Sequence, residues 1–178
     1  QTSELLERLD KVEILTPTQA KLFQVLKTDV AVLGKLIYNF ELWAADDEFS
    51  DHEVNKFKHL ERICLKLQKL CVSGDEATTP VEAQKMLHET EFFSHLAYAL
   101  KVDLDDLSPS CGALLSQLRA LMCRTASRFV AGNLKNQNLV SKVVPSAIAV
   151  LDEQPECALL MAEIYRGNLE LCQQVPLD

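Results

Sequence analysis

The chain has 178 residues, of which 48% are apolar, and a formal net charge of −8 at pH 7. This length and composition are typical of one domain with a buried core, and they exclude intrinsic disorder. The acidic balance excludes nucleic acid and anionic membrane as main partners, because both require a dense cationic surface. No apolar run approaches the roughly 18 residues of a membrane-spanning helix, so we expect no membrane contact by this segment itself.

Capping boxes mark the beginnings of helices in the first half of the chain. The three boxes are Thr16-Pro17-Thr18-Gln19, Ser50-Asp51-His52-Glu53 and Thr79-Pro80-Val81-Glu82. Each precedes a run in which apolar residues recur three and four positions apart, which is the period of an amphipathic helix. We expect helices over 3–14, 17–43 (with a candidate weak point at Gly34), 51–72, two short stretches between 80 and 100, 111–131, and short helices split by Pro145 and Pro155 that end near Val175.

A tight corner is predicted after the helix over 111–131. Gly132 tolerates the left-handed conformation that closes a helix, and Asn133 is well suited to cap the next one. Phe129 precedes the corner, and Asn136 and Gln137 place two amides beside it. These amides have two interpretations: they satisfy backbone groups at the corner, or they hold an extended peptide, as inner-face asparagines do in some armadillo proteins.

The fold class that follows is all-α, arranged as an armadillo-like superhelical stack of helical hairpins, with a closed bundle as the competing arrangement. No segment shows the sustained alternation of a β-strand, and no exact internal repeat is visible. We expect a single module over 1–178, with an N-terminal helical hairpin over 1–48 and armadillo helices over 50–178. Because Gln1 is not a methionine, a piece of a longer protein is expected.

Motifs for catalysis or metal binding are weak in this sequence. The acidic run over 46–53 lacks the glycine and the ligand spacing of a calcium-binding EF-hand loop, so it indicates a solvated linker. The histidines do not form HExxH, and the six cysteines form no CxxC, which favours buried reduced thiols over zinc or disulfides. We therefore expect no enzyme activity, no cofactor and no metal.

Two further features are candidates for contacts with other proteins or domains. Four cations, Lys58, Arg62, Lys66 and Lys69, lie on one face of the helix over 51–72. This basic face could bind an anionic partner, or it could be an ordinary solvated surface. Trp43, the only tryptophan, is expected to anchor one helix pair on the next rather than to stack on a ligand.

Several short islands of sequence resemble the inositol trisphosphate receptors, which are intracellular calcium-release channels. The islands, in chain order, are Glu41-Leu42-Trp43, Leu67-Gln68-Lys69-Leu70-Cys71-Val72, Gln84-Lys85-Met86-Leu87, Phe129 with Ala131-Gly132-Asn133 and Asn136-Gln137, and finally Ile164, Asn168 and Leu171-Cys172. The fourth island is similar to the homology motif shared with ryanodine receptors, called the RIH domain. The order and spacing of the islands carry the resemblance, which extends over most of 41–172.

The resemblance implies a cytosolic solenoid segment of a tetrameric channel in the endoplasmic reticulum membrane. Such a segment would relay allosteric signals between the ligand-binding region and the pore. Its partners would be other domains and subunits of the channel, together with regulatory proteins. No inositol phosphate site is implied, because the family's ligand-binding core is not part of this sequence. The alternative is a free-standing armadillo-type adaptor that binds peptides or proteins through the corner amides and the basic face.

Overall fold

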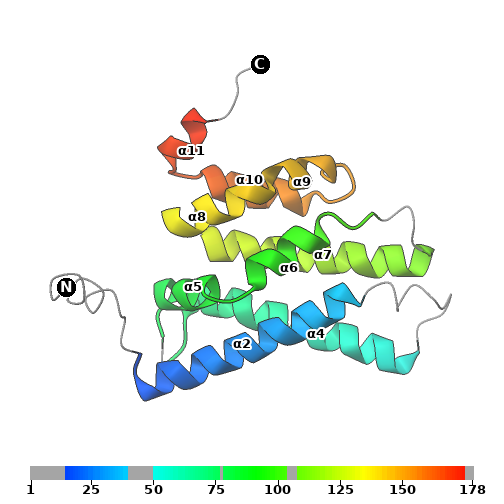
Figure 1. Cartoon of the computed structure of the whole chain (residues 1–178), viewed down its shortest axis with the longest axis horizontal. Helices are drawn as coiled ribbons and strands as arrows, with labels where there is room; N and C mark the ends of the chain where they lie inside the picture. Colours follow the sequence, from blue (N-terminus) through cyan, green and yellow to red (C-terminus); the bar gives the residue numbers. More distant parts are fainter. Residues whose placement is uncertain (1–14, 40–49, 77, 104–107, 175–178) are drawn as a thin grey trace, which may run out of the picture.

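The computed structural model describes residues 15–39, 50–76, 78–103 and 108–174, except for the side chains of residues 52 and 53. These parts of the chain consist of helices joined by short connections, with no β-strand among them (Figure 1). The helices are α2 (Pro17–Tyr38), α4 (Asp51–Ser73), α5 (Pro80–His88), α6 (Phe92–Ala99), α7 (Pro109–Val130), α8 (Leu134–Val140), the 3-10 helix η1 (Ser141–Val143), α9 (Val144–Ala149), α10 (Glu156–Tyr165) and α11 (Leu169–Gln173). The all-α prediction is confirmed for these residues.

Two of the predicted capping boxes are formed, and they also bond to each other. In the first, the Thr16 amide donates to Gln19 Oε1 at 3.0 Å, and the Gln19 amide donates to Thr16 Oγ1 at 3.2 Å. Thr79 and Glu82 make the same reciprocal pair, and hydrogen bonds from Thr79 lower the pKa of the Glu82 carboxyl. Gln19 Nε2 donates to Glu82 Oε1 at 3.1 Å, so the beginnings of α2 and α5 are joined. The third predicted box, over 50–53, cannot be assigned, because the side chain of residue 53 lies outside the described part of the structure.

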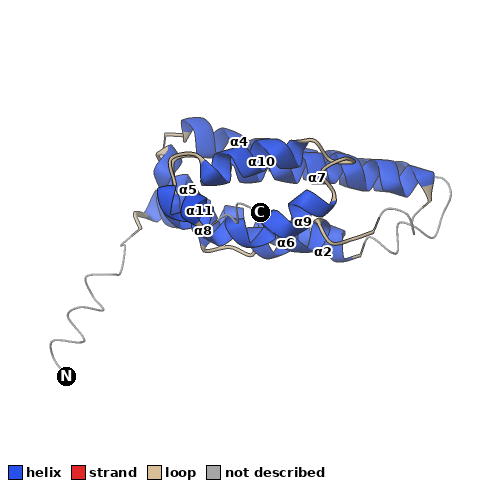
Figure 2. Ribbon diagram, turned by 90° about the horizontal axis from the view of Figure 1, so that it is seen from above, coloured by secondary structure: helices blue, strands red, loops and turns tan. Residues whose placement is uncertain are grey.

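The helices form a stack of two layers. Helices α4, α7 and α10 lie in one layer, and α2, α6, α8 and α9 lie in the other (Figure 2). Along the chain, the stack rises from α2 and α4 through α5, α6 and α7 to α8, α9 and α10, with α11 at the far end (Figure 1). Helix α7 is central, since it packs against α4 on one side and α10 on the other.

The centre of the stack is mostly apolar, and it also contains buried polar side chains and one buried arginine. The core side of α7 contributes Leu115, Met122 and Phe129, all fully buried. Arg119 of the same helix is only 1% exposed, which is unusual for arginine. Its Nε donates to the Ala99 carbonyl at 2.7 Å, and its Nη2 donates to the Val102 carbonyl, so the guanidinium closes the end of α6. Burial lowers the pKa of Arg119.

Two details of the predicted helices need correction. Helix α2 ends at Tyr38 rather than at 43. Gly34 is not a weak point, because α2 is continuous through it. A Cβ at this position would lie 2.4 Å from the His95 ring, so glycine permits close packing of α2 on α6. The predicted divisions at the two prolines are present, because Pro145 lies in the first turn of α9, directly after η1, and Pro155 directly precedes α10. Four predicted features lie wholly or largely outside the described residues: the helix over 3–14, the acidic linker, Trp43 and much of the hairpin over 1–48.

Candidate functional site

The corner between α7 and α8 is built as the sequence predicts. Helix α7 ends at Val130, Gly132 has a φ of +66°, and α8 begins immediately after Asn133. The Asn136 amide donates to Asn133 Oδ1 at 3.1 Å, which caps α8. A positive φ is easily adopted by glycine and costs other residues energy, so Gly132 is what allows the chain to reverse here.

Asn136 joins three helices at this corner. Its side chain is 1% exposed, and its Nδ2 donates to the Phe129 carbonyl at 2.9 Å. Its Oδ1 lies 2.7 Å from Nδ1 of His88, the last residue of α5. Phe129 is itself buried and packs edge-to-face on Phe92 of α6, with ring centroids 6.0 Å apart. The predicted motif residues Asn136 and Phe129 therefore tie the end of α7 to its neighbours.

Gln84 of α5 binds the carbonyl end of α7. Its Nε2 donates to the carbonyls of Arg128 at 2.9 Å and of Ala131 at 3.0 Å. Its Oε1 accepts from Asn133 Nδ2 at 3.3 Å. The last carbonyls of a helix have no partner within the helix, so one buried amide here satisfies the groups that the corner would otherwise leave open. We call this arrangement of glutamine, two carbonyls and capping asparagine a corner clamp.

A second corner clamp repeats the first one at the end of α10. Gln137 Nε2 donates to the carbonyls of Glu163 at 2.9 Å and of Arg166 at 3.0 Å, and Asn168 Nδ2 donates to Gln137 Oε1 at 3.2 Å. Gly167 has a φ of +72°, and Asn168 caps α11 as Asn133 caps α8. Gln84 lies on α5 and binds the end of α7, and Gln137 lies on α8 and binds the end of α10. Each clamp glutamine thus binds the end of a helix that comes later in the chain. The clamps therefore join successive levels of the stack.

The two corners also correspond in sequence, and the sequence reasoning missed this. Gly132-Asn133-Leu134 occurs again as Gly167-Asn168-Leu169, a tripeptide repeat that would have revealed the second corner. Gln84 lies in one of the resembling islands but was not predicted to have a role at the corner. Of the two interpretations of the amides, the structure favours backbone satisfaction: Asn136 and Gln137 are buried and bond within the fold.

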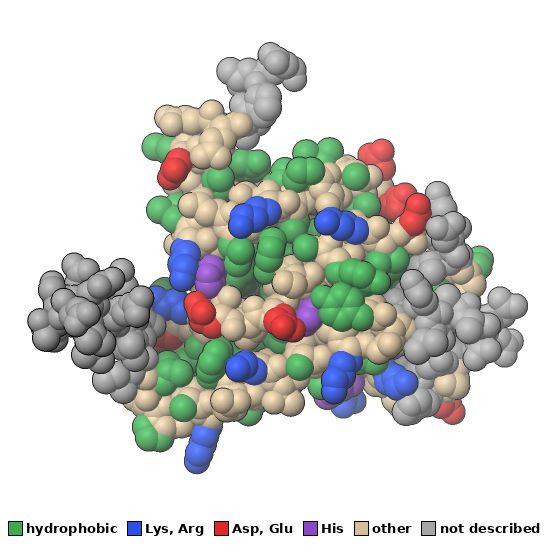
Figure 3. Space-filling model, viewed as in Figure 1, with side chains coloured by type: hydrophobic (Ala, Val, Ile, Leu, Met, Phe, Trp, Pro, Cys, Tyr) green, Lys and Arg blue, Asp and Glu red, His purple; other side chains and the backbone are tan. Residues whose placement is uncertain are grey.

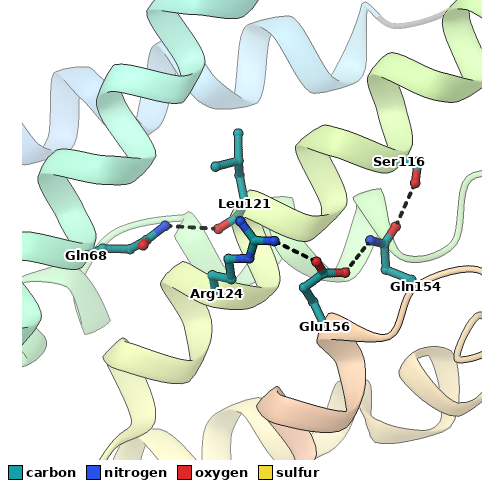
Figure 4. A network of polar contacts seen from close by, with 6 residues as sticks. All are labelled: Gln68, Ser116, Leu121, Arg124, Gln154 and Glu156. Carbon is teal, nitrogen blue, oxygen red and sulfur yellow. Dashed lines mark hydrogen bonds and ion pairs between the residues drawn. The ribbon is translucent and has the colours of Figure 1, made fainter.

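On the other side of the stack, two sets of polar contacts join α4 to α7 and α7 to the start of α10 (Figure 4). Gln68 of α4 donates to the Leu121 carbonyl of α7. The second set comprises Arg124, Glu156, Gln154 and Ser116. Arg124 Nη2 lies 2.8 Å from Glu156 Oε1, and Gln154 Nε2 donates to Glu156 Oε2 at 2.9 Å. The bond from Gln154, with help from Arg124, lowers the pKa of the Glu156 carboxyl. Glu156 is therefore held as an anion between α7 and α10.

The predicted basic face is exposed but is not entirely free. Lys58, Arg62, Lys66 and Lys69 all lie on the solvent side of α4. Lys66 Nζ lies 2.7 Å from Asp29 Oδ2 of α2, so this lysine joins two helices. No ion pair of the other three cations occurs within the described parts of the chain. An exposed pair of this kind contributes at most about 1 kcal/mol.

The arrangement is suited to holding helices in fixed relative positions. In the ranges that the structure describes, no cluster of three metal-ligating side chains occurs. Among the same residues, no helix is long and apolar enough to cross a bilayer. Comparison with protein-family models, with curated proteins and with solved structures gives no match for this chain.

Proposed function

We propose that this chain is a regulatory and structural solenoid segment of an inositol trisphosphate receptor-like calcium-release channel. In this proposal the stack is armadillo-like, lies on the cytosolic side of the endoplasmic reticulum membrane, and contacts other domains and subunits of a tetramer. It relays movement between the ligand-binding region and the pore by rigid shifts of packed helices.

The repeated corner clamp is the observation that carries the proposal. A relay must pass displacement from one level to the next without losing it in loose connections. Gln84 and Gln137 each bridge two carbonyls at the end of a helix in the following level, and both are buried. Buried hydrogen bonds of this kind resist separation, because breaking them leaves polar groups unpaired away from water.

The clamps also coincide with the residues through which the sequence resembles the receptor family. Gln84, Asn133, Gln137 and Asn168 all belong to the resembling islands, and each contributes a side-chain bond to a clamp. Three of the five islands, which contain Gln84, Asn133 with Gln137, and Asn168, are separated in sequence but meet at the two corners. This meeting supports a shared architecture, because scattered identities have no reason to converge on one structural device.

The proposal is tested in the full parent protein, expressed in cells without other inositol trisphosphate receptors. Replacing Gln137 with leucine should raise the inositol trisphosphate concentration needed for calcium release, while ligand binding stays unchanged. Because the substitution also lowers stability, release is compared at matched levels of folded protein. Gln117→Leu, the same change at an exposed position of α7, is the control. A parent reading frame without membrane-spanning helices, or normal release from a Gln137→Leu channel, would contradict the proposal.

The alternative is an adaptor that binds peptides through the corner amides and the basic face. The amides of Gln84, Asn136 and Gln137 already bond within the fold, and Lys66 is paired with Asp29. An adaptor would therefore need a different binding surface.

A further inference from the structure

A groove with a volume of about 270 Å³ lies between α4, α7 and α10, on the solvent side of that layer. Leu159 and Ala162 of α10 give it an apolar wall, and Gln68 and Ser127 contribute polar groups from α4 and α7. Neither the predicted basic face nor the corner amides line it. Gln68 and Arg124, which line the groove, also belong to the polar contacts of Figure 4.

The groove has an excess of positive charge in a chain whose net charge is −8. Arg124, Arg128 and Arg166 line it. Arg124 is paired with Glu156 at 2.8 Å, and Arg166 is paired with Glu163 at 3.0 Å. Arg128 is exposed and forms no ion pair with any residue that the structure describes. Three guanidinium groups therefore face two carboxylates. By contrast, charges of both signs are interspersed on the face formed by α2, α6 and α8 (Figure 3).

The backbone of two of these arginines is fixed by the corner clamps. Gln84 binds the Arg128 carbonyl at 2.9 Å, and Gln137 binds the Arg166 carbonyl at 3.0 Å. The clamps thus set the separation between the groove-lining ends of α7 and α10. A site that is held before its ligand arrives loses less entropy on binding.

Exposed apolar side chains extend the surface beyond the groove. Leu159 is 59% exposed at the wall. Leu65 and Val72 lie one turn before and one turn after Gln68, on the same side of α4, and they are 52% and 54% exposed. The surface therefore combines apolar contact area with one unpaired cation.

We propose that this groove binds an acidic segment of a partner protein, with an aspartate or glutamate on Arg128 and a leucine-like side chain on Leu159 and Ala162. Arginine suits this role because its fork of donors binds a carboxylate through two parallel bonds. A polyanion such as nucleic acid is disfavoured, because it needs many free cations and Arg124 and Arg166 are already paired with Glu156 and Glu163. This proposal does not depend on whether the chain belongs to a calcium channel.

The test measures fluorescence anisotropy of a dye-labelled peptide, Glu-Leu-Glu-Glu-Leu-Glu, against the 178-residue chain. A peptide with lysine in place of glutamate is the charge control. We expect saturable binding of the acidic peptide that weakens at high salt, and no binding of the lysine peptide. Arg128→Glu should weaken binding about tenfold or more, whereas Arg62→Glu, the same change on the basic face, should weaken it less than about twofold.

The possible outcomes distinguish binding in the groove from binding on the basic face and from non-specific anion binding. The proposal would be overturned if Arg128→Glu and Arg62→Glu weakened binding equally, or if both peptides bound equally well. It would also be overturned if an equal concentration of inorganic phosphate displaced the peptide, or if no saturable binding occurred. The Tm of each variant is measured alongside. If Arg128→Glu lowers the Tm, Arg128→Gln, which removes the guanidinium without introducing a negative charge, replaces it and should still weaken binding.

Discussion

Replacing Gln137 with leucine removes the second corner clamp with little change of side-chain size. The substitution deletes the donors to the carbonyls of Glu163 and Arg166, at 2.9 and 3.0 Å, and the acceptor for Asn168. Leucine has no polar atom with which to replace them. Asn168 keeps a second acceptor, Asn138 Oδ1 at 3.0 Å, so the main loss is at the two carbonyls.

The expected magnitude follows from these two carbonyls. Gln137 is fully buried, so water does not take its place. Each buried polar group left unpaired costs about 1–3 kcal/mol, and the added apolar burial of leucine returns about 1 kcal/mol. For two carbonyls, the net decrease in the free energy of unfolding should be about 1–5 kcal/mol. For a chain of this length, that corresponds to a fall in Tm of about 2–20 °C.

The assay is urea unfolding followed by far-ultraviolet circular dichroism, with the linear dependence on urea compared between variants. Gln117→Leu, at an exposed position of α7, controls for the substitution itself and should change stability by less than about 0.5 kcal/mol. Asn168→Ala completes a double-mutant cycle, in which we expect coupling with Gln137→Leu. Equal stability of the Gln137→Leu and Gln117→Leu variants would refute the clamp.

Three further predictions concern single residues. Gly132→Ala should lower the free energy of unfolding by about 1 kcal/mol, from the φ of +66° alone, since no atom lies within 4 Å of the added Cβ. Gly34→Ala should lower it more, because the added Cβ would lie 2.4 Å from the His95 ring. A smaller loss at Gly34 than at Gly132 in urea unfolding would contradict this. Burial lowers the pKa of His95 below its ordinary value of 6.5, so the unfolded chain takes up a proton at higher pH than the folded one. Stability should therefore fall as the pH drops below about 6.5, and urea unfolding of His95→Gln should show a weaker pH dependence; parallel curves would exclude His95 as the cause. Of the six cysteines, only Cys172 is exposed, so a thiol reagent should label one site rapidly in the folded protein and all six in urea; two or more rapid sites would show that the buried thiols are accessible.

Local signals in the sequence were sufficient for the helix ends and for the first corner. The capping pairs at Thr16 and Thr79 join residues only three positions apart, and Gly132 acts through its own φ. Such signals depend on the chain within one turn, so they can be read without knowing the fold. The repeated Gly-Asn-Leu tripeptide is an equally local signal, although a repeat of three residues is short.

Non-local contacts decided the rest. Gly34 faces His95, which no helical pattern indicates, and the pattern alone suggested a weak point instead. Arg119 is buried because the carbonyls of Ala99 and Val102 meet it, whereas its charge alone predicts exposure.

The sequence by itself determined that the chain is helical, where several helices begin, and that it turns at Gly132. Only the tertiary structure decided which helix end each amide binds and which arginines meet in one groove. Gln84 is bound to Arg128, and Gln137 to Glu163, across stretches of chain that contain whole helices. The physical reason is that a cap needs only its own turn, whereas a clamp needs two helices already packed at the right distance.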